Sequence, residues 1–182
     1  VRAELGLIFH GLLTSGKIDL AVDGSPVKPR DPFLSGNLRS QDLGTDKIIA
    51  DGHSVLVTPR VLPHPSDLRE EDIQSIGDPA RLADSQGFYV RCAGRYLYRG
   101  GWLGVPDLDL GPDTALARVE VEIDEEDLAA WGLDGKAEAL AIPPALRRRL
   151  IGLAHRARQR SRQVIHHRKT DDSHNGGRAV NG

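Results

Sequence analysis

The chain has 182 residues, which is enough for one domain or for one domain with a tail. Its 39% hydrophobic and 27% charged residues exclude a wholly disordered or collagen-like chain. Aromatic residues make up only 4%, which argues against a base-stacking platform, and the net charge of −2 balances 24 basic against 26 acidic side chains.

Cysteine content and hydropathy indicate the cellular compartment of the protein. Cys92 is the only cysteine, so the chain forms neither an internal disulfide nor a four-cysteine zinc site. No run approaches the ~20 apolar residues that cross a bilayer, and no secretion signal opens the sequence. We therefore expect a cytoplasmic protein without a membrane partner. Because the chain contains no methionine, we also expect it to begin inside a longer gene product or to have been processed.

The N-terminal segment predicts the end of a helix and then a ribbon. Apolar residues between 2 and 13 recur at intervals of three and four, which places them on one helical face. Residues 17–22 alternate with the period of a strand, and Asp23-Gly24 supplies a tight turn. The prolines in 26–29 favour an edge strand on the return.

The middle of the chain predicts a sheet and a short helix. Residues 47–58 supply apolar side chains for a sheet that we expect to end at Pro59, and 66–76 has the acidic start of a helix. Residues 87–98 are typical of a β-hairpin. The glycine pair before Trp102 indicates a bend or a close approach by another segment.

The last part of the chain gives the clearest patterns. Residues 116–123 alternate strictly, as in a strand with one buried face, and 143–169 has the apolar spacing of a helix. Residues 170–182 are polar and glycine-rich, so we expect a disordered tail. The whole predicts an α+β domain over 15–142, with a mixed or antiparallel sheet backed by helices, followed by the basic helix.

That helix carries the main candidate site. It has no acidic side chain between 143 and 168, and a one-sign run of this length can neutralise phosphates. The alternative is a solvated face that covers an acidic neighbour, since basic residues also suit a helix C-terminus. The candidate nucleic-acid-binding residues are Arg147, Arg148, Arg149, Arg156, Arg158, Arg160 and Arg162.

Other chemically capable residues favour structural roles. His155, His166 and His167 lack a carboxylate or cysteine at ligand spacing, so we predict no metal site, and His10, His53 and His64 are isolated. The acidic run 124–127 suits helix capping. Cys92 falls on a predicted strand, where packing is favoured over catalysis. The sequence has neither a P-loop nor a dinucleotide-binding turn.

Several segments, taken in order, carry a resemblance. The chain is similar, from about Leu5 to Arg162, to the region that follows the nucleotide-binding domain in bacterial ATP-binding proteins of the GHKL class, which includes DNA gyrase, heat-shock chaperones, histidine kinases and mismatch-repair proteins. The segments are Leu7-Ile8-Phe9-His10, Asp23-Gly24-Ser25-Pro26-Val27, Asp31-Pro32-Phe33, Gln86-Gly87-Phe88-Tyr89-Val90-Arg91 with Arg95, Gly100-Gly101-Trp102-Leu103, Leu116-Ala117-Arg118-Val119-Glu120-Val121, Trp131-Gly132-Leu133-Asp134-Gly135-Lys136 and Pro143-Pro144.

The resemblance implies a transducer domain with a fold like domain 2 of ribosomal protein S5. It implies that residues 1–14 end a helix of a preceding ATPase domain, which would be the partner in cis and would bind ATP and Mg²⁺, and that the protein is a homodimer. Lys136 is the candidate catalytic residue, directed at the γ-phosphate, although the family carries a more basic motif where this chain has Lys136-Ala137-Glu138. A surface lysine is the alternative.

Two functions follow from these observations. The first is a transducer that couples the nucleotide state of a missing ATPase domain to dimerisation or to contact with DNA or a partner. On this hypothesis the chain binds no cofactor by itself and is inactive alone, because the magnesium-binding and adenine-binding motifs belong to the preceding domain. The second is a noncatalytic module that binds nucleic acid or supports assembly through the arginine-rich helix.

Overall fold

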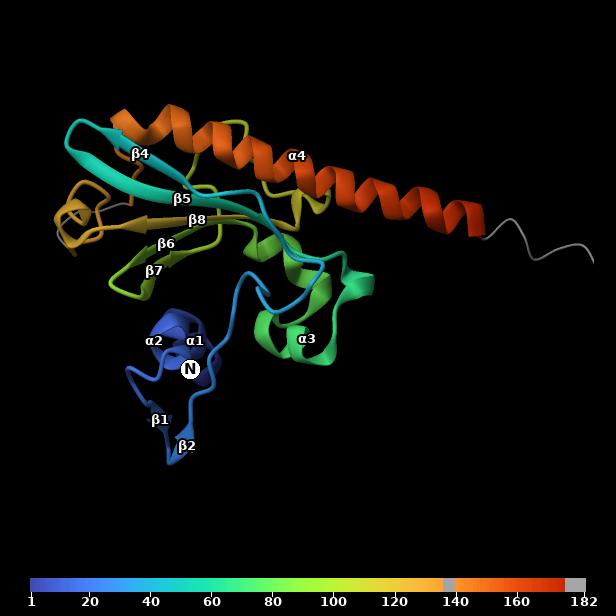
Figure 1. Cartoon of the computed structure of the whole chain (residues 1–182), viewed down its shortest axis with the longest axis horizontal. Coiled ribbons are helices and arrows are strands. Elements are labelled where there is room, and N and C mark those ends of the chain that lie inside the picture. The colour runs from blue at the N-terminus through green and yellow to red at the C-terminus, as the bar shows by residue number, and fades with distance from the viewer. Residues whose placement is uncertain (136–139, 176–182) are drawn as a thin grey trace, which may run out of the picture.

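A mixed sheet organises the fold, as a computed structural model that describes residues 1–135 and 140–175 shows (Figure 1). The sheet has six strands in the order β3-β5-β8-β6-β7, and β4 pairs with β5 beside β3. Strands β6 and β8 run parallel, whereas the other neighbours are antiparallel. This is the α+β class predicted from the sequence. The strands are β3 (Gln41–Asp42), β4 (Asp46–Ala50), β5 (His53–Val61), β6 (Gly87–Cys92), β7 (Arg95–Arg99) and β8 (Ala117–Ile123).

Helix α4 (Pro144–Asn175) covers one face of this sheet (Figure 1). Its buried residues Leu146, Leu150, Ala154 and Ala157 recur at intervals of three and four, so they form one apolar stripe that packs on the sheet. The helix begins where the prolines predicted. It continues past 169, so residues 170–175, expected to be disordered, are helical, while 176–182 lie outside the described residues.

The opposite side of the sheet carries an N-terminal unit, residues 1–30, and a helical segment that contains α3 (Figure 1). The predicted helix over 2–13 is interrupted at Phe9, whose ψ of 17° leaves the helical range. The predicted strand over 17–22 forms only its last pair of residues. These elements are α1 (Arg2–Ile8), α2 (His10–Thr14), β1 (Ala21–Val22), β2 (Ser25–Pro26), η1 (Pro65–Asp67), α3 (Glu70–Ile76), η2 (Pro79–Ser85), η3 (Pro112–Thr114) and η4 (Glu125–Asp127).

Strand β5 runs through Pro59, although this proline was expected to end the strand. Pro59 pairs with Val119 of β8 on one side. On its other side lies the break between β3 and β4, where Pro59 accepts a hydrogen bond from the amide of Leu43 at 3.0 Å. The Thr45 and Thr58 hydroxyls, 2.8 Å apart, bridge the same break. A residue without an amide hydrogen is tolerated because the ladder is already interrupted there.

The second face of β8 is buried as well, which the alternation of 116–123 did not predict. Glu120 accepts hydrogen bonds from Arg60 Nη2 at 3.0 Å and from the Tyr96 hydroxyl at 2.9 Å. Phe33 closes over this group, with the Arg60 guanidinium 5.1 Å from its ring centre. The same face buries Arg118, which donates to backbone carbonyls and to the Ser85 hydroxyl. Burial of these charges is tolerated because Glu120 is paired with Arg60 and Arg118 donates to neutral oxygens.

The glycine pair before Trp102 marks a close approach of two backbones, as predicted. Gly87 and Gly101 form a β-bridge, and a Cβ atom on Gly87 would overlap the Gly101 backbone. Trp102 is 4% exposed, stacks edge-on against Phe88 and donates its indole hydrogen to Gln86 at 3.3 Å. This hydrogen bond positions Trp102 at the start of the loop that contains residues 107–109. Arg158 of α4 packs against that loop.

Candidate nucleic-acid interface

The arginines of α4 divide into an exposed set and one buried member. Arg147, Arg148 and Arg149 lie on the first turns and are exposed, and Arg149 has Asp46 at 4.0 Å. In the second half of the helix, the exposed members are Arg156, Arg160 and Arg162.

Arg158, which was predicted to contact nucleic acid, has a structural position instead. It is 5% exposed, and its guanidinium donates to the carbonyls of Asp107 at 2.8 Å and Asp109 at 3.1 Å. The same group lies 5.6 Å from the centre of the Trp102 ring. Loss of hydration, and to a lesser degree the nearby Arg162, lowers the pKa of this guanidinium. Arg158 therefore fastens α4 to the loop around 107–109.

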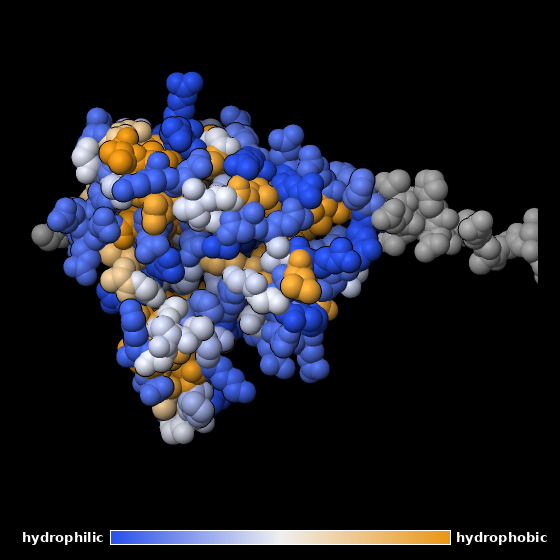
Figure 2. All heavy atoms as spheres, in the orientation of Figure 1, coloured by the Kyte–Doolittle hydropathy of each residue, from blue (hydrophilic) through white to orange (hydrophobic). Residues whose placement is uncertain are grey.

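The second half of α4 borders a hollow of about 860 Å³ (the basic groove), which also involves two segments from the first half of the chain. A smaller hollow of about 290 Å³ continues it and shares Gln159, Arg160 and Gln163. Figure 2 shows a mostly hydrophilic surface over this region, interrupted by single hydrophobic side chains. The charged and imidazole side chains that line the basic groove and its continuation are Arg39, His64, Asp67, Arg156, Arg160, Arg162, His166, His167 and Arg168.

The positive charge of the basic groove is largely uncompensated. Asp67 is the only carboxylate among the described residues that line it, and Asp67 is already paired with Arg168. Arg160 donates to the neutral side chains of Gln41 at 2.6 Å and Gln163 at 2.9 Å. Among the side chains of residues 1–135 and 140–168, no carboxylate lies at ion-pair distance from Arg39, Arg156 or Arg162. An anion would therefore meet an excess of positive charge here.

Helical spacing explains which arginines share a side of α4. Arg149, Arg156 and Arg160 are seven and four residues apart, so they point in similar directions, and Gln163 and His167 continue the row. Sequence reasoning missed the residues that close the groove from across it, namely Arg39, His64 and Asp67. No local pattern marks them, because the fold brings them to α4 from about a hundred residues away.

A hydrogen-bond junction positions these closing residues. The Asn37 side-chain amide donates to the Asp67 carbonyl at 3.2 Å and to Asp72 Oδ2 at 2.7 Å. The loop that carries Arg39 is thereby joined to η1 and α3. His64 caps η1, since its Nδ1 accepts from the Ser66 amide at 3.2 Å. The groove wall opposite α4 is thus a fixed part of the fold.

The remaining candidates have structural positions. Cys92 is buried, burial raises the pKa of its thiol, and it packs in the core as predicted. Asp127, in the acidic run at η4, lies 2.6 Å from Nδ1 of His53, which ties the β4–β5 turn to η4. His155 is exposed on α4. Among the side chains of residues 1–135 and 140–168, no group of three His, Cys, Asp or Glu is placed to hold a metal ion.

Lys136, the candidate catalytic residue, lies outside the described residues. None of the described helices is both long and apolar enough to cross a membrane. Comparisons of the chain with family models, with curated proteins and with solved structures found no match. The geometry of the basic groove is therefore the main basis for a functional conclusion.

The side chains of the basic groove suit binding more than turnover. Guanidinium groups match phosphate oxygens in charge and geometry, and arginine stays protonated at any physiological pH. No Phe, Tyr or Trp side chain lines the described part of the groove, so it lacks the large aromatic platform on which successive bases stack. Contacts of this kind recognise a phosphate backbone without reading its sequence.

Proposed function

We propose that this domain binds nucleic acid, without catalysis, through the basic groove. The observation that carries the proposal is the uncompensated charge of the groove, in which the single described carboxylate is already paired with Arg168. From Arg156 to Arg168 the helix rises about 18 Å at 1.5 Å per residue. This length corresponds to about five base-pair steps along the axis of duplex DNA, at 3.4 Å each.

The proposed binding mode fixes its salt dependence. Arginines that contact phosphates release condensed cations, so the logarithm of the binding constant falls linearly with the logarithm of the salt concentration. Each phosphate contact contributes a slope of about −0.9 for duplex DNA. Because guanidinium contacts to phosphates do not read the bases, duplexes of different sequence should bind with similar affinity.

The test replaces Arg156, Arg160 and Arg162 by glutamine and measures DNA binding by fluorescence anisotropy between low and high salt. We expect the salt slope to become shallower by about 2 to 3, with a matching loss of affinity at low salt. Arg158 is left intact because it holds the 107–109 loop.

A control with the same charge change separates the groove from general electrostatics. The variant Arg95→Gln/Arg147→Gln/Arg148→Gln removes exposed arginines that do not line the groove. It should bind nearly as well as the unmodified chain. An equal loss in both triple variants would assign the binding to overall charge, and an unchanged slope in the groove variant would remove nucleic acid from the proposal.

A second proposed function is the transducer of a GHKL-type ATP-binding protein. The observation that favours it is the fold class, because a mixed sheet backed by a long helix is the architecture that the resemblance implies. On this proposal the chain acts with a preceding ATPase domain that binds ATP and Mg²⁺, and Lys136 approaches the γ-phosphate.

The second proposal is tested in a protein that carries this chain after such an ATPase domain. Lys136→Ala should abolish ATP-dependent dimerisation, measured by sedimentation, whereas Lys47→Ala on the exposed face of β4 should leave it intact. Dimerisation that ignores both substitutions would count against a phosphate-sensing role for Lys136.

A further inference from the structure

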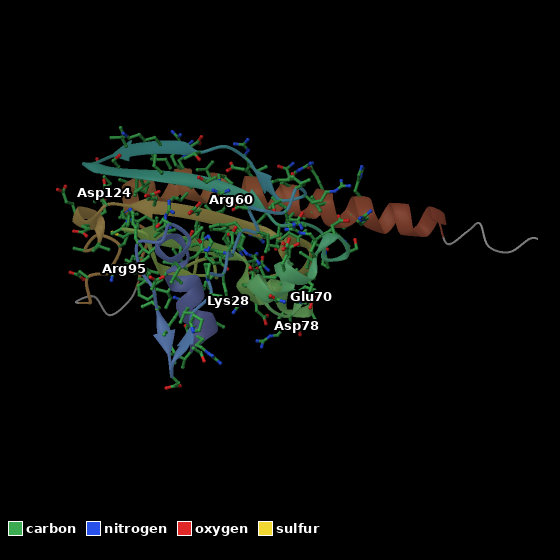
Figure 3. All side chains as sticks on the ribbon, turned by 60° about the horizontal axis from the view of Figure 1, so that its bottom comes forward. Lys28, Arg60, Glu70, Asp78, Arg95 and Asp124 are labelled. Carbon is green, nitrogen blue, oxygen red and sulfur yellow. The ribbon has the colours of Figure 1, made fainter. Side chains whose placement is uncertain are left out.

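A second cationic hollow lies on the other side of the sheet from α4. It measures about 340 Å³ and lies between α1, the segment that follows β2, and α3. None of its lining residues belongs to the basic groove. In Figure 3, Lys28 lies between the N-terminal helices and Glu70, the first residue of α3. We call this second hollow the N-terminal hollow. The polar residues that line it are Arg2, Lys28, Arg30, Glu71, Gln74 and Ser75.

Arg30 is the feature that sets this hollow apart. Its side chain is half-buried, and Nε is shielded from solvent without a hydrogen-bond acceptor. No carboxylate among the described residues lies at ion-pair distance from its guanidinium. The side chain crosses from the N-terminal unit to the end of α3, where Nη2 passes close to Gly77. A guanidinium held in a partly dehydrated position without a counter-charge is destabilising unless an anion joins it.

The neighbouring charges strengthen this imbalance. Lys28 and Arg2 are exposed at the rim and have no ion pair within the described part of the chain. The one carboxylate in the lining belongs to Glu71, which is 68% exposed and pairs with Arg69 Nη1 at 2.5 Å. Three cations therefore share the hollow with one carboxylate that already has a partner. Neutral donors are also present in the Gln74 amide and the Ser75 hydroxyl.

We propose that the N-terminal hollow binds a compact phosphate dianion, either free phosphate or the phosphate group of a small metabolite. A forked guanidinium beside a lysine ammonium and a hydroxyl is suited to several oxygens of one phosphate. The volume of about 340 Å³ lies at the lower end of small-ligand sites, which suits a single phosphate group or a small phosphate ester. The proposal is independent of nucleic-acid binding, because it uses different residues.

Occupancy would join two parts of the molecule. The lining comes from α1 and the segment after β2 on one side and from α3 on the other. A phosphate that contacts both sides replaces a repulsive cluster by ionic hydrogen bonds. The bound anion should therefore hold the N-terminal unit against α3 and stabilise the folded chain by an amount that rises with the logarithm of the phosphate concentration above the Kd.

The test titrates the full chain with inorganic phosphate and, separately, with glycerol 2-phosphate, at constant ionic strength. Binding is followed by amide chemical shifts of Lys28, Ser75 and Gly77. We expect saturable one-site shifts, with at least about a tenfold weaker affinity in Arg30→Gln and a severalfold weaker affinity in Lys28→Gln. Tighter binding of the monoester would identify a metabolite as the source, and tighter binding of phosphate the free ion.

The control and the contrary outcomes are defined in the same titration. Arg95→Gln removes an exposed arginine of β7 outside the hollow and should leave the affinity unchanged. Shifts that grow linearly without saturation, or that weaken equally in Arg30→Gln and Arg95→Gln, would overturn the proposal. If Arg30→Gln proves unfolded by thermal denaturation, the exposed Lys28→Gln decides the matter, and unchanged affinity there would also overturn it.

Discussion

Asp72 shows how one buried carboxylate can order several segments. It is 3% exposed and accepts hydrogen bonds from the Arg69 amide at 2.8 Å, from Arg69 Nε at 3.0 Å and from Asn37 Nδ2 at 2.7 Å. The Arg69 side chain, followed by its amide and the Asn37 amide, lowers the pKa of Asp72 despite the opposing effect of burial. The junction holds α3 and the loop of Arg39, and through Asn37 it supports the wall of the basic groove.

A lowered pKa makes this junction sensitive to acid. The stabilisation by Asp72 is complete above its unfolded-state pKa, ~3.9, and is lost as the pH falls through the lower folded-state value. Asp72→Asn should reduce the free energy of unfolding by about 1–3 kcal/mol at pH 7. The difference from the unmodified chain should shrink below about pH 4. Urea unfolding at several pH values measures both effects.

The surface pair of Asp84 and Arg81 supplies the control for this prediction. Asp84 is 61% exposed and accepts from Arg81 Nε at 2.9 Å. Because exposed ion pairs contribute little, Asp84→Asn should change the free energy of unfolding by less than about 1 kcal/mol. A loss for Asp72→Asn that stays constant from pH 7 down to pH 2 would contradict the role given to its ionised form.

Single residues also mark the limit of what the sequence predicts about the site. The run of arginines on α4 was recognisable because it is local and of one sign. The burial of Arg158 was not, because it depends on Trp102 and on two carbonyls about fifty residues earlier. The participation of Arg39 likewise depends on Asn37, whose partners lie in another segment. Local spacing carries no information about such partners.

At the level of elements, local periodicity predicted most of the core. The apolar stripe of α4 and the alternation of β8 both follow from side chains a few residues apart, and both elements were expected. The second buried face of β8 was not expected, because Glu120 is neutralised by Arg60 and hydrogen-bonded by Tyr96, which belong to other strands. The prediction that Pro59 ends its strand was wrong. The break between β3 and β4 that accommodates this proline depends on how the strands pair, which the local sequence does not show.

At the scale of the whole molecule, stability should be distributed unevenly. Strands β5, β8 and β6 are each paired on both sides, and Val57, Val90 and Val119 are fully buried. The N-terminal unit instead has a ribbon of two residues per strand and few buried side chains. Val27 and Arg30 hold it through amide hydrogen bonds to Leu20 and Gly6, at 2.8 and 3.0 Å.

Native-state hydrogen exchange tests this difference. A hydrogen-bonded amide exchanges only when the structure around it opens, so its exchange rate reports the free energy of that opening. The amides of Val27 and Arg30 should exchange through a local opening of the N-terminal unit, and those of Val57 and Val119 only through global unfolding. We expect a difference of about 4 kcal/mol or more, about a thousandfold in protection. Rates measured at two pH values ensure that equilibrium opening is observed. Equal protection of Val27 and Val119 would instead make the N-terminal unit part of the same cooperative core as the sheet.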